Sequence, residues 1–262
     1  MSNSQALAQL SDWFATPLGR YLLDAELAYF DHELADVFGF NAIQLGLPEH
    51  DFLRSNRMPF RYIAGPHGRV GLRADLAALP VQTASADLVV MPHTLEFNSN
   101  PHQVLREVSR ILMPEGHVVI AGFNPWSLWG LRRLRARSRD TAPWAGQFIH
   151  LPRLKDWMAL LGFELSGGRM CCYTPPFNSE KWLRRFGFME AAGDRWWPIA
   201  GGIYFLHAIK RVQGMRIITP KWRDAQAKKK ALAPVPHKTS PEDAMAARDR
   251  LSARSPMPGE RR

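Results

Sequence analysis

Residues 86–123 contain two apolar runs on either side of a helical pattern, and this arrangement limits the fold more than any other feature of the sequence. ADLVVM at 86–91 and HVVIAGF at 117–123 are rich in β-branched residues and are typical of buried strands. Between them, Asn100 followed by proline predicts a helix start. A strand, a helix and a second strand predict a right-handed crossover between parallel strands, and therefore an α/β fold.

Elements of the same kind are expected on both sides of this unit. An apolar stripe of Leu23, Leu27, Phe30, Leu34 and Val37 predicts an amphipathic helix over 20–38, and Leu154 to Leu161 predict another. Further strands are expected at NAIQL (41–45), FRYIA (60–64), more weakly RVGLRAD (69–75), then FELSGGRMCCY (163–173) and GGIYFLHAI (201–209). The long segment between the last two strands is expected to cover the sheet edge or the site.

The positive charge of the chain is concentrated at its C-terminal end. The 262 residues carry a formal net charge of +10, and thirteen of the 34 basic residues lie in 211–262 with five acidic ones. This part includes KKK at 228–230 and few large apolar residues, a composition typical of disorder. The expected organisation is an N-terminal extension (1–19), one α/β domain (20–212) and a basic, disordered tail (213–262).

The sequence contains few signals for a cellular compartment or for metal binding. The N-terminus lacks a signal-peptide pattern, and the uncharged apolar run at 196–209 is too short to span a bilayer. Cys171 and Cys172 are the only cysteines, and as neighbours they predict neither an unstrained disulfide nor a metal site. We therefore expect a cytoplasmic protein with no structural metal.

Residues 74–125 carry a resemblance to a known family. The matching features are Asp75, Leu79-Pro80, DLVV at 87–90, LEF at 95–97, LRE at 105–107 and LMPEG at 112–116. In this block the chain resembles the type 11 domain of class I S-adenosylmethionine-dependent methyltransferases, and the likeness extends over roughly 20–210. The resemblance implies a Rossmann-like, mostly parallel sheet of seven strands in the order 3-2-1-4-5-7-6, flanked by helices, with one antiparallel strand near the edge.

The resemblance also implies a cofactor site for S-adenosylmethionine at the carboxyl ends of the first strands. Its implied cofactor contacts are Gly46 and Leu47 in the glycine loop, Asp75 for the adenine amino group, Leu76 beside it, and Met91 and Pro92 after the fourth strand. His93 is the candidate catalytic base, needed only where the acceptor must lose a proton. The acceptor itself is unknown, and we expect a small molecule.

The glycine loop departs from the family pattern. The family has an acid followed by three alternate glycines, and this chain has Gln44, Gly46, Pro48 and His50. Pro48 removes one backbone donor, and both Pro48 and His50 add a Cβ where close approach is wanted. The acid that holds the ribose at the end of the second strand is also not evident in RYIAGPHG. A catalytically inactive binding or scaffolding protein of the same fold is therefore the alternative hypothesis.

Three further features leave alternatives open. Glu96 either pairs with His93 or is a surface carboxylate near a helix start. The arginine-rich segment 128–139 either binds an anionic substrate, nucleic acid or a membrane surface, or forms a solvated helix. The basic tail suggests a weak contact with nucleic acid.

Overall fold

A computed structural model describes residues 9–135 and 141–212. The expected tail (213–262) and part of the arginine-rich segment (136–139) lie outside these residues. The helices are α2 (Pro17–Leu34), α3 (Pro101–Ile111), α4 (Leu128–Arg135), α5 (Leu151–Leu160), α6 (Glu180–Arg185) and α7 (Phe188–Trp196). The strands are β1 (Asn41–Leu45), β2 (Phe60–Gly65), β3 (Leu72–Arg73), β4 (Ala86–Pro92), β5 (Leu112–Phe123), β6 (Phe163–Cys171) and β7 (Ile203–Lys210).

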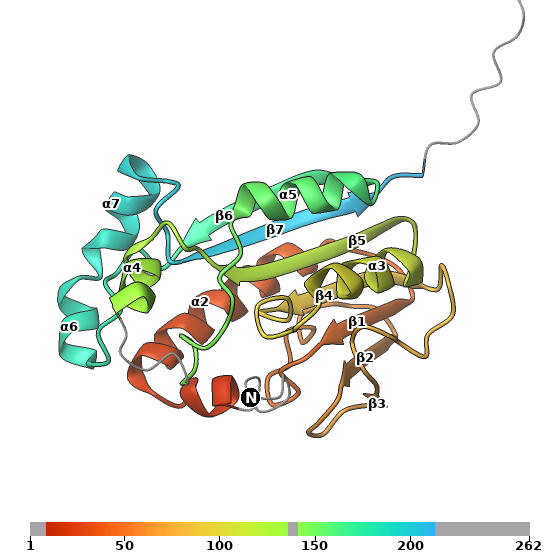
Figure 1. The fold of residues 1–262 in the computed structure, drawn as a ribbon, viewed down its shortest axis with the longest axis horizontal. Coiled ribbons are helices and arrows are strands. Elements are labelled where there is room, and N and C mark those ends of the chain that lie inside the picture. Colours follow the sequence, from red (N-terminus) through yellow and green to blue (C-terminus); the bar gives the residue numbers. More distant parts are fainter. Residues whose placement is uncertain (1–8, 136–140, 213–262) are drawn as a thin grey trace, which may run out of the picture. The chain divides into compact units, whose positions relative to one another are not determined.

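The seven strands form one sheet in the order β3-β2-β1-β4-β5-β7-β6 (Figure 1). The strands β1 to β5 pair in parallel, and β7 runs antiparallel to both of its neighbours. The expected Rossmann-like fold, strand order and antiparallel strand are confirmed. Because β6 and β5 both run opposite to β7, the carboxyl ends of β1, β4, β5 and β6 lie along one edge of the sheet.

The two faces of the sheet are covered by different helices, and the strand pleat sorts the core accordingly. Along β4, Leu88 and Val90 pack into the core under α2, whereas Val89 and Met91 pack into the core under α3 and α5. This period-two alternation of apolar residues buries both faces, as expected for a strand in the middle of an α/β sheet. The apolar run of β4 is thus explained by burial from both sides.

Helix α2 differs from its sequence-based description in its bounds and in its buried face. It starts three residues earlier than predicted, at Pro17, and Thr16 caps it by accepting a hydrogen bond from the backbone N–H of Gly19 at 3.1 Å. Leu23 and Leu27, which the predicted stripe contained, are only partly buried. The buried face follows a four-residue spacing instead, with Leu18, Leu22, Glu26, Phe30 and Leu34. A carboxylate therefore lies in the middle of the apolar face of α2.

Two charged side chains of α3 hold the segment that follows Asp75. Glu107 accepts a hydrogen bond from the N–H of Leu79, and Arg110 donates to the carbonyls of Leu79 at 2.9 Å and Val81 at 2.8 Å. These charged side chains of α3 hold the Leu79-Pro80 segment, which in turn follows Asp75 closely in the chain. Glu107 of the LRE motif and Arg110 thus hold the segment between β3 and β4 against α3.

Candidate active site

The turn after β1 wraps around the side chain of Gln44, which is fully buried. Its amide nitrogen lies 3.0 Å from the carbonyl of Gly46, 3.1 Å from that of Leu47 and 2.8 Å from that of His50. Its amide oxygen accepts a hydrogen bond from the N–H of Phe52. A carboxylate here could not donate to three carbonyls. Glutamine in place of the family's acid therefore suits the conformation of this particular loop.

Gly46 and Leu47 both have a left-handed backbone, with φ of 84° and 47°. A Cβ at Gly46 would lie 3.6 Å from Thr94 Oγ1, an ordinary contact, so the backbone angle and not lack of space calls for glycine at this position. Leu47 is 1% exposed. Pro48, where the family has its second glycine, packs against Gly68, whose added Cβ would lie 2.5 Å from Pro48 Cγ. The loop after β2 thus closes against the loop after β1.

His50 occupies the position of the family's third glycine and packs inward. Its ring centroid lies 5.2 Å from that of Phe14, in the segment before α2, and its Nε2 is buried with no hydrogen-bond partner among the described residues. Burial lowers the pKa of His50, and the nearby carboxylates of Glu49 and Glu26 oppose that shift. Part of the space that a glycine loop leaves open is therefore filled by an imidazole.

Directly after β4, His93 lies between two carboxylates. Its Nε2 is 2.5 Å from Glu26 Oε1 on α2, and its Nδ1 is 2.7 Å from Glu96 Oε2. The side chains of His93 and Glu26 are fully buried, and that of Glu96 is 1% exposed. The imidazole also stacks on Phe123 at 4.2 Å between ring centroids. We call Glu26, His93 and Glu96 the buried acid–histidine cluster.

The environment of the cluster sets the charge of each member. Burial alone would lower the pKa of His93, but the charge of Glu26 and hydrogen bonds to both carboxylates raise it to about 10. Burial raises the pKa of Glu96, and its bonds to His93 and to the N–H of Phe123 oppose that shift. An imidazolium between two ionised carboxylates carries a net charge of −1, and the raised pKa of Glu96 reduces this negative excess.

One oxygen of the cluster is left without a partner. Glu26 Oε2 is buried and accepts no hydrogen bond from any described residue. A buried, unpaired carboxylate oxygen is costly, and such groups in native proteins call for a ligand, an ion or a water. The net negative charge and the unpaired oxygen together fit a cationic ligand. Sequence reasoning missed Glu26, although its four-residue spacing from Leu22 and Phe30 was a signal for a buried position.

The predicted site residues fall into two groups. Gly46, Met91, Pro92 and His93 are all buried where β1 and β4 end, and Thr94 joins these ends by donating to the carbonyl of Leu45 at 2.5 Å. Asp75 is exposed in a turn after β3, where its Oδ1 accepts from the N–H of Ala77 at 3.0 Å, and Leu76 is buried beside it. The surface-carboxylate interpretation of Glu96 is wrong, because Glu96 is buried and paired with His93.

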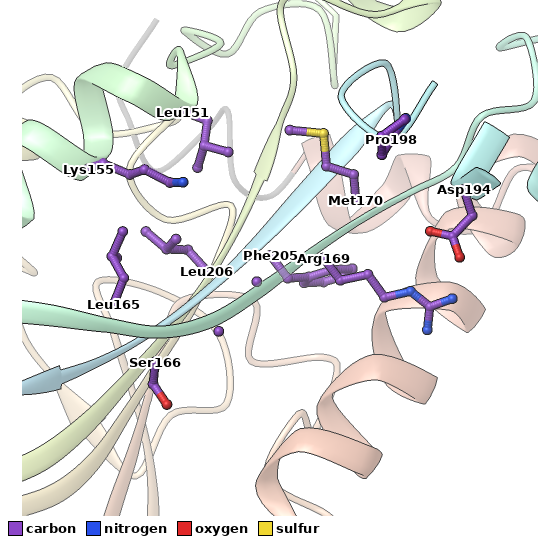
Figure 2. Close-up of a pocket in the computed structure, with 12 residues that line it drawn as sticks. Leu151, Lys155, Leu165, Ser166, Arg169, Met170, Asp194, Pro198, Phe205 and Leu206 are labelled. Atoms are coloured by element: carbon purple, nitrogen blue, oxygen red, sulfur yellow. The ribbon is translucent and has the colours of Figure 1, made fainter. Parts of the chain in front are cut away.

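A separate pocket of about 430 Å³ lies beside the edge strand (Figure 2). Lys155 of α5 lies at one end of it, and Arg169 of β6 and Asp194 of α7 lie at the other. None of the predicted cofactor residues lines this pocket. The described residues contain no group of three or more His, Cys, Asp or Glu side chains that could hold a metal ion, and none of their helices is long and apolar enough to cross a membrane.

Comparisons with known proteins show which sequences this chain resembles. Residues 61–120 match the family model described as a methyltransferase domain. The chain is 42% identical over 96 residues to the uncharacterized protein YafS of Escherichia coli, covering 37% of this chain and 40% of that one. It is 30% identical over 82 residues to the demethylmenaquinone methyltransferase of Chlamydia pneumoniae, covering 30% and 35% of the two chains. The matches thus span well under two thirds of these relatives.

The solved structures extend the likeness to most of the described chain. A SAM-dependent methyltransferase of Thermotoga maritima, described as a possible histamine N-methyltransferase, aligns with a TM-score of 0.53 and 15% identity. The alignment covers 73% of this chain and 93% of that one. At this identity the likeness shows the fold, which is that of class I methyltransferases.

Proposed function

We propose that this chain, which matches a methyltransferase domain over residues 61–120 and has the class I methyltransferase fold, is an S-adenosylmethionine-dependent methyltransferase that transfers a methyl group from this cofactor to a small-molecule acceptor. S-adenosylmethionine is the cofactor that the family implies. The observation that carries the proposal is the buried acid–histidine cluster, whose net negative charge and unpaired Glu26 oxygen lie where β4 ends.

The chemistry of the cofactor matches that of the cluster. S-adenosylmethionine supplies a methyl group on a positively charged sulfonium, so it needs no further activation for transfer. Glu26 would compensate the positive charge of the bound cofactor, because its Oε2 has no other partner among the described residues. Gly46 and Leu47 would present the turn after β1, Met91 and Pro92 the end of β4, and Asp75 and Leu76 the adenine end of the site.

The role of His93 follows from its two partners. With both ring nitrogens held by carboxylates and no exposed surface, the imidazolium orients Glu26 and Glu96. As a base it would first have to lose a proton that both neighbours stabilise. We therefore propose that His93 positions the cluster, and that it acts as the base predicted from the sequence only when the covering residues open. The main contribution to rate is then alignment of the acceptor with the methyl group.

The same enclosure favours the alternative function. Because Glu26 is fully buried, a ligand reaches it only if the residues that cover it move. Pro48 offers no N–H, and the loop after β2 has no acid for the ribose. A protein that keeps the fold as a binding or scaffolding module, without turnover, is consistent with a site that is closed in this way.

Calorimetric titration with S-adenosylmethionine and with its demethylated product separates these functions. We expect both to bind the full-length protein, and Asp75→Ala to weaken binding at least ten-fold while leaving the fold intact, since Asp75 is exposed. Asp51→Ala is the matched control, because Asp51 makes the same turn contact with the N–H of Leu53, at 2.9 Å, and is also exposed. If neither compound binds at millimolar concentration, the enzyme proposal fails and the scaffolding alternative stands.

A further inference from the structure

The carboxyl edge of the sheet carries an exposed surface of aromatic, leucine and arginine side chains. It is formed by α4, α6, α7 and the residues that follow α7, which lie at the same end of the molecule (Figure 1). Its apolar members, all at least 46% exposed, are Trp126, Leu134, Trp182, Phe188, Trp196 and Trp197. Its exposed basic members are Arg132, Arg135, Lys181, Arg184, Arg185 and Arg195. We call this surface the aromatic–arginine face.

Hydrogen bonds attach the helices of the face to the core, so its exposed rings belong to elements with a fixed position. Trp129 of α4 is fully buried and donates from its indole N–H to the carbonyl of Thr174 at 3.1 Å, and Arg132 donates to the carbonyl of Pro176. Glu190 of α7 accepts hydrogen bonds from the N–H groups of Cys172 and Thr174. These contacts attach both helices to the same segment after β6.

The aromatic rings of the face also contact one another. Trp182 stacks on Phe186 at 5.7 Å between ring centroids, and Phe186 lies 6.5 Å from Phe188. At the other end of the face, Asn124 donates to the carbonyl of Ile199 and accepts from the N–H of Trp126. This links Trp126 to the residues that follow Trp197. The face is thus one surface, larger than the isolated exposed apolar residues that are normal on a protein.

The face carries more basic than acidic exposed side chains, with Glu180 and Asp194 as its exposed acidic residues against six basic ones. Helix α4 contains three arginines and no acidic residue, and α6 contains three basic residues and Glu180. None of the ion pairs among the described residues includes Arg184, Arg185 or Arg195. Burying such a surface against another protein would require a partner that matches several separate cations. An anionic bilayer satisfies them all without a fixed geometry, because basic side chains extend to the headgroups while the rings enter the interface.

We propose that the aromatic–arginine face docks on an anionic lipid bilayer. Trp and Phe beside Lys and Arg on short helices are the composition of segments that lie in a membrane interface. The chain outside the described residues adds further positive charge, since residues 213–262 hold twelve basic and five acidic residues. Each Lys or Arg near an anionic surface contributes attraction of its own, so a basic tail and a basic face act together.

Docking in this orientation has a consequence for the substrate. Cys171 at the end of β6 pairs with Ile203, which also pairs with Phe123 at the end of β5, so the face follows directly from the carboxyl edge of the sheet. That edge would then be turned toward the bilayer, where an amphiphilic acceptor reaches it without crossing water. This consequence rests on the proposed function, whereas docking itself does not.

Vesicle flotation of the full-length protein without cofactor tests the docking. We expect the protein to float with phosphatidylcholine vesicles that contain phosphatidylglycerol and to stay below with phosphatidylcholine alone. Arg184→Ala together with Arg185→Ala should weaken partitioning about 25-fold, from about five-fold for each charge removed. Trp196→Ala together with Trp197→Ala should weaken it several-fold and reduce the quenching of tryptophan fluorescence by brominated lipid, with Trp126 and Trp182 of the face giving the quenching that remains.

The matched controls replace side chains of the same kinds on another surface and leave residues 213–262 unchanged. Phe38→Ala with Phe40→Ala removes two rings that are 70% and 69% exposed near the start of β1, and Arg57→Ala with Arg106→Ala removes two exposed charges elsewhere. Both controls should float as the unaltered protein does. Absence of flotation with anionic vesicles overturns the proposal and points to a protein partner for the face. Equal losses in the controls also overturn it, because the charge and apolar area of the whole surface, and not this face, would then explain binding. Unchanged flotation of both face variants overturns it too, because residues outside the face would then suffice.

Discussion

Helix α2 places two glutamates against two histidines, one directly after β4 and one in β7. Both are carboxylate–imidazole pairs, but they differ in how deeply they are buried. Glu26 contacts His93 after β4, and Glu33, two helical turns later on the same side, contacts His207 of β7 at 2.6 Å. A second partner completes each set, Glu96 in the first and His117, 2.8 Å from His207, in the second. The first set is sealed at the carboxyl edge of the sheet, and Glu33 is partly open to water.

Burial decides how much each pair contributes to the stability of the fold. Water screens Glu33, whose side chain is 25% exposed, so its pairing with His207 resembles a surface ion pair of about 1 kcal/mol or less. Glu26 and His93 are not exposed at all, so each charge depends on its protein partner. Of these two sets, the buried acid–histidine cluster is therefore the one whose charges are screened least and can attract a charged ligand most strongly.

The largest effect is expected from His93→Leu, which leaves Glu26 and Glu96 facing each other in the core without a cation. Removing one partner of a buried ionic group costs about 3 to 5 kcal/mol, and we expect a loss of this size in the free energy of unfolding in urea. Adding Glu26→Gln to His93→Leu should recover part of the loss, because it removes one uncompensated charge. No recovery would mean that His93 stabilises through packing on Phe123 and not through charge.

A second effect is the pH dependence that His93 gives to stability. Its pKa is raised to about 10 in the folded protein, so the folded state holds one more proton than the unfolded state between pH 6.5 and 10. His93 therefore stabilises fully below pH 6.5, and its contribution falls with rising pH across that window, at most about 1.4 kcal/mol per pH unit. Over any single pH unit this change is smaller than the loss on truncation, because a neutral imidazole still packs and donates one hydrogen bond.

Urea titrations at intervals from pH 6 to 10 measure this slope. The variant that lacks both His93 and the Glu26 charge, His93→Leu with Glu26→Gln, provides the reference, since titration of His93 is absent from it. We expect the difference in the free energy of unfolding between the two proteins to shrink as pH rises. A difference that stays constant over the window would show that His93 is neutral in the folded state.

Sequence patterns predicted the fold because they depend on local periodicity. ADLVVM, the helix after Asn100 and HVVIAGF are defined by neighbours in the chain, and the structure places all three as expected, although β5 starts earlier, at Leu112. The RVGLRAD segment yields only the two-residue strand β3, in which Leu72 and Arg73 pair with Ala64 and Gly65 of β2. The strand order came from the resemblance, and the structure confirms it.

The site was predicted less completely, because its charges come from distant parts of the chain. His93 and Glu96 are three residues apart and were visible as a pair, but Glu26 lies 67 residues from His93, and nothing local marks that contact. Similarly, Gln44 looked like the loss of an acid, and only the folded loop shows three carbonyls around its amide. Side chains that act across the core are specified by the tertiary fold and not by periodicity.

The smallest expected effect concerns Glu33 and His207, the partly exposed pair of α2. Glu33→Gln keeps the shape of the side chain and a hydrogen-bonding oxygen near His207 Nδ1, and it removes only a charge that water already screens. We expect a loss of about 1 kcal/mol or less in the free energy of unfolding, and no change in cofactor affinity, because Glu33 lies two helical turns from Glu26. Glu26→Gln, by contrast, should weaken cofactor binding strongly. Equal effects on binding would show that the whole charged face of α2, and not the unpaired oxygen of Glu26, attracts the cofactor.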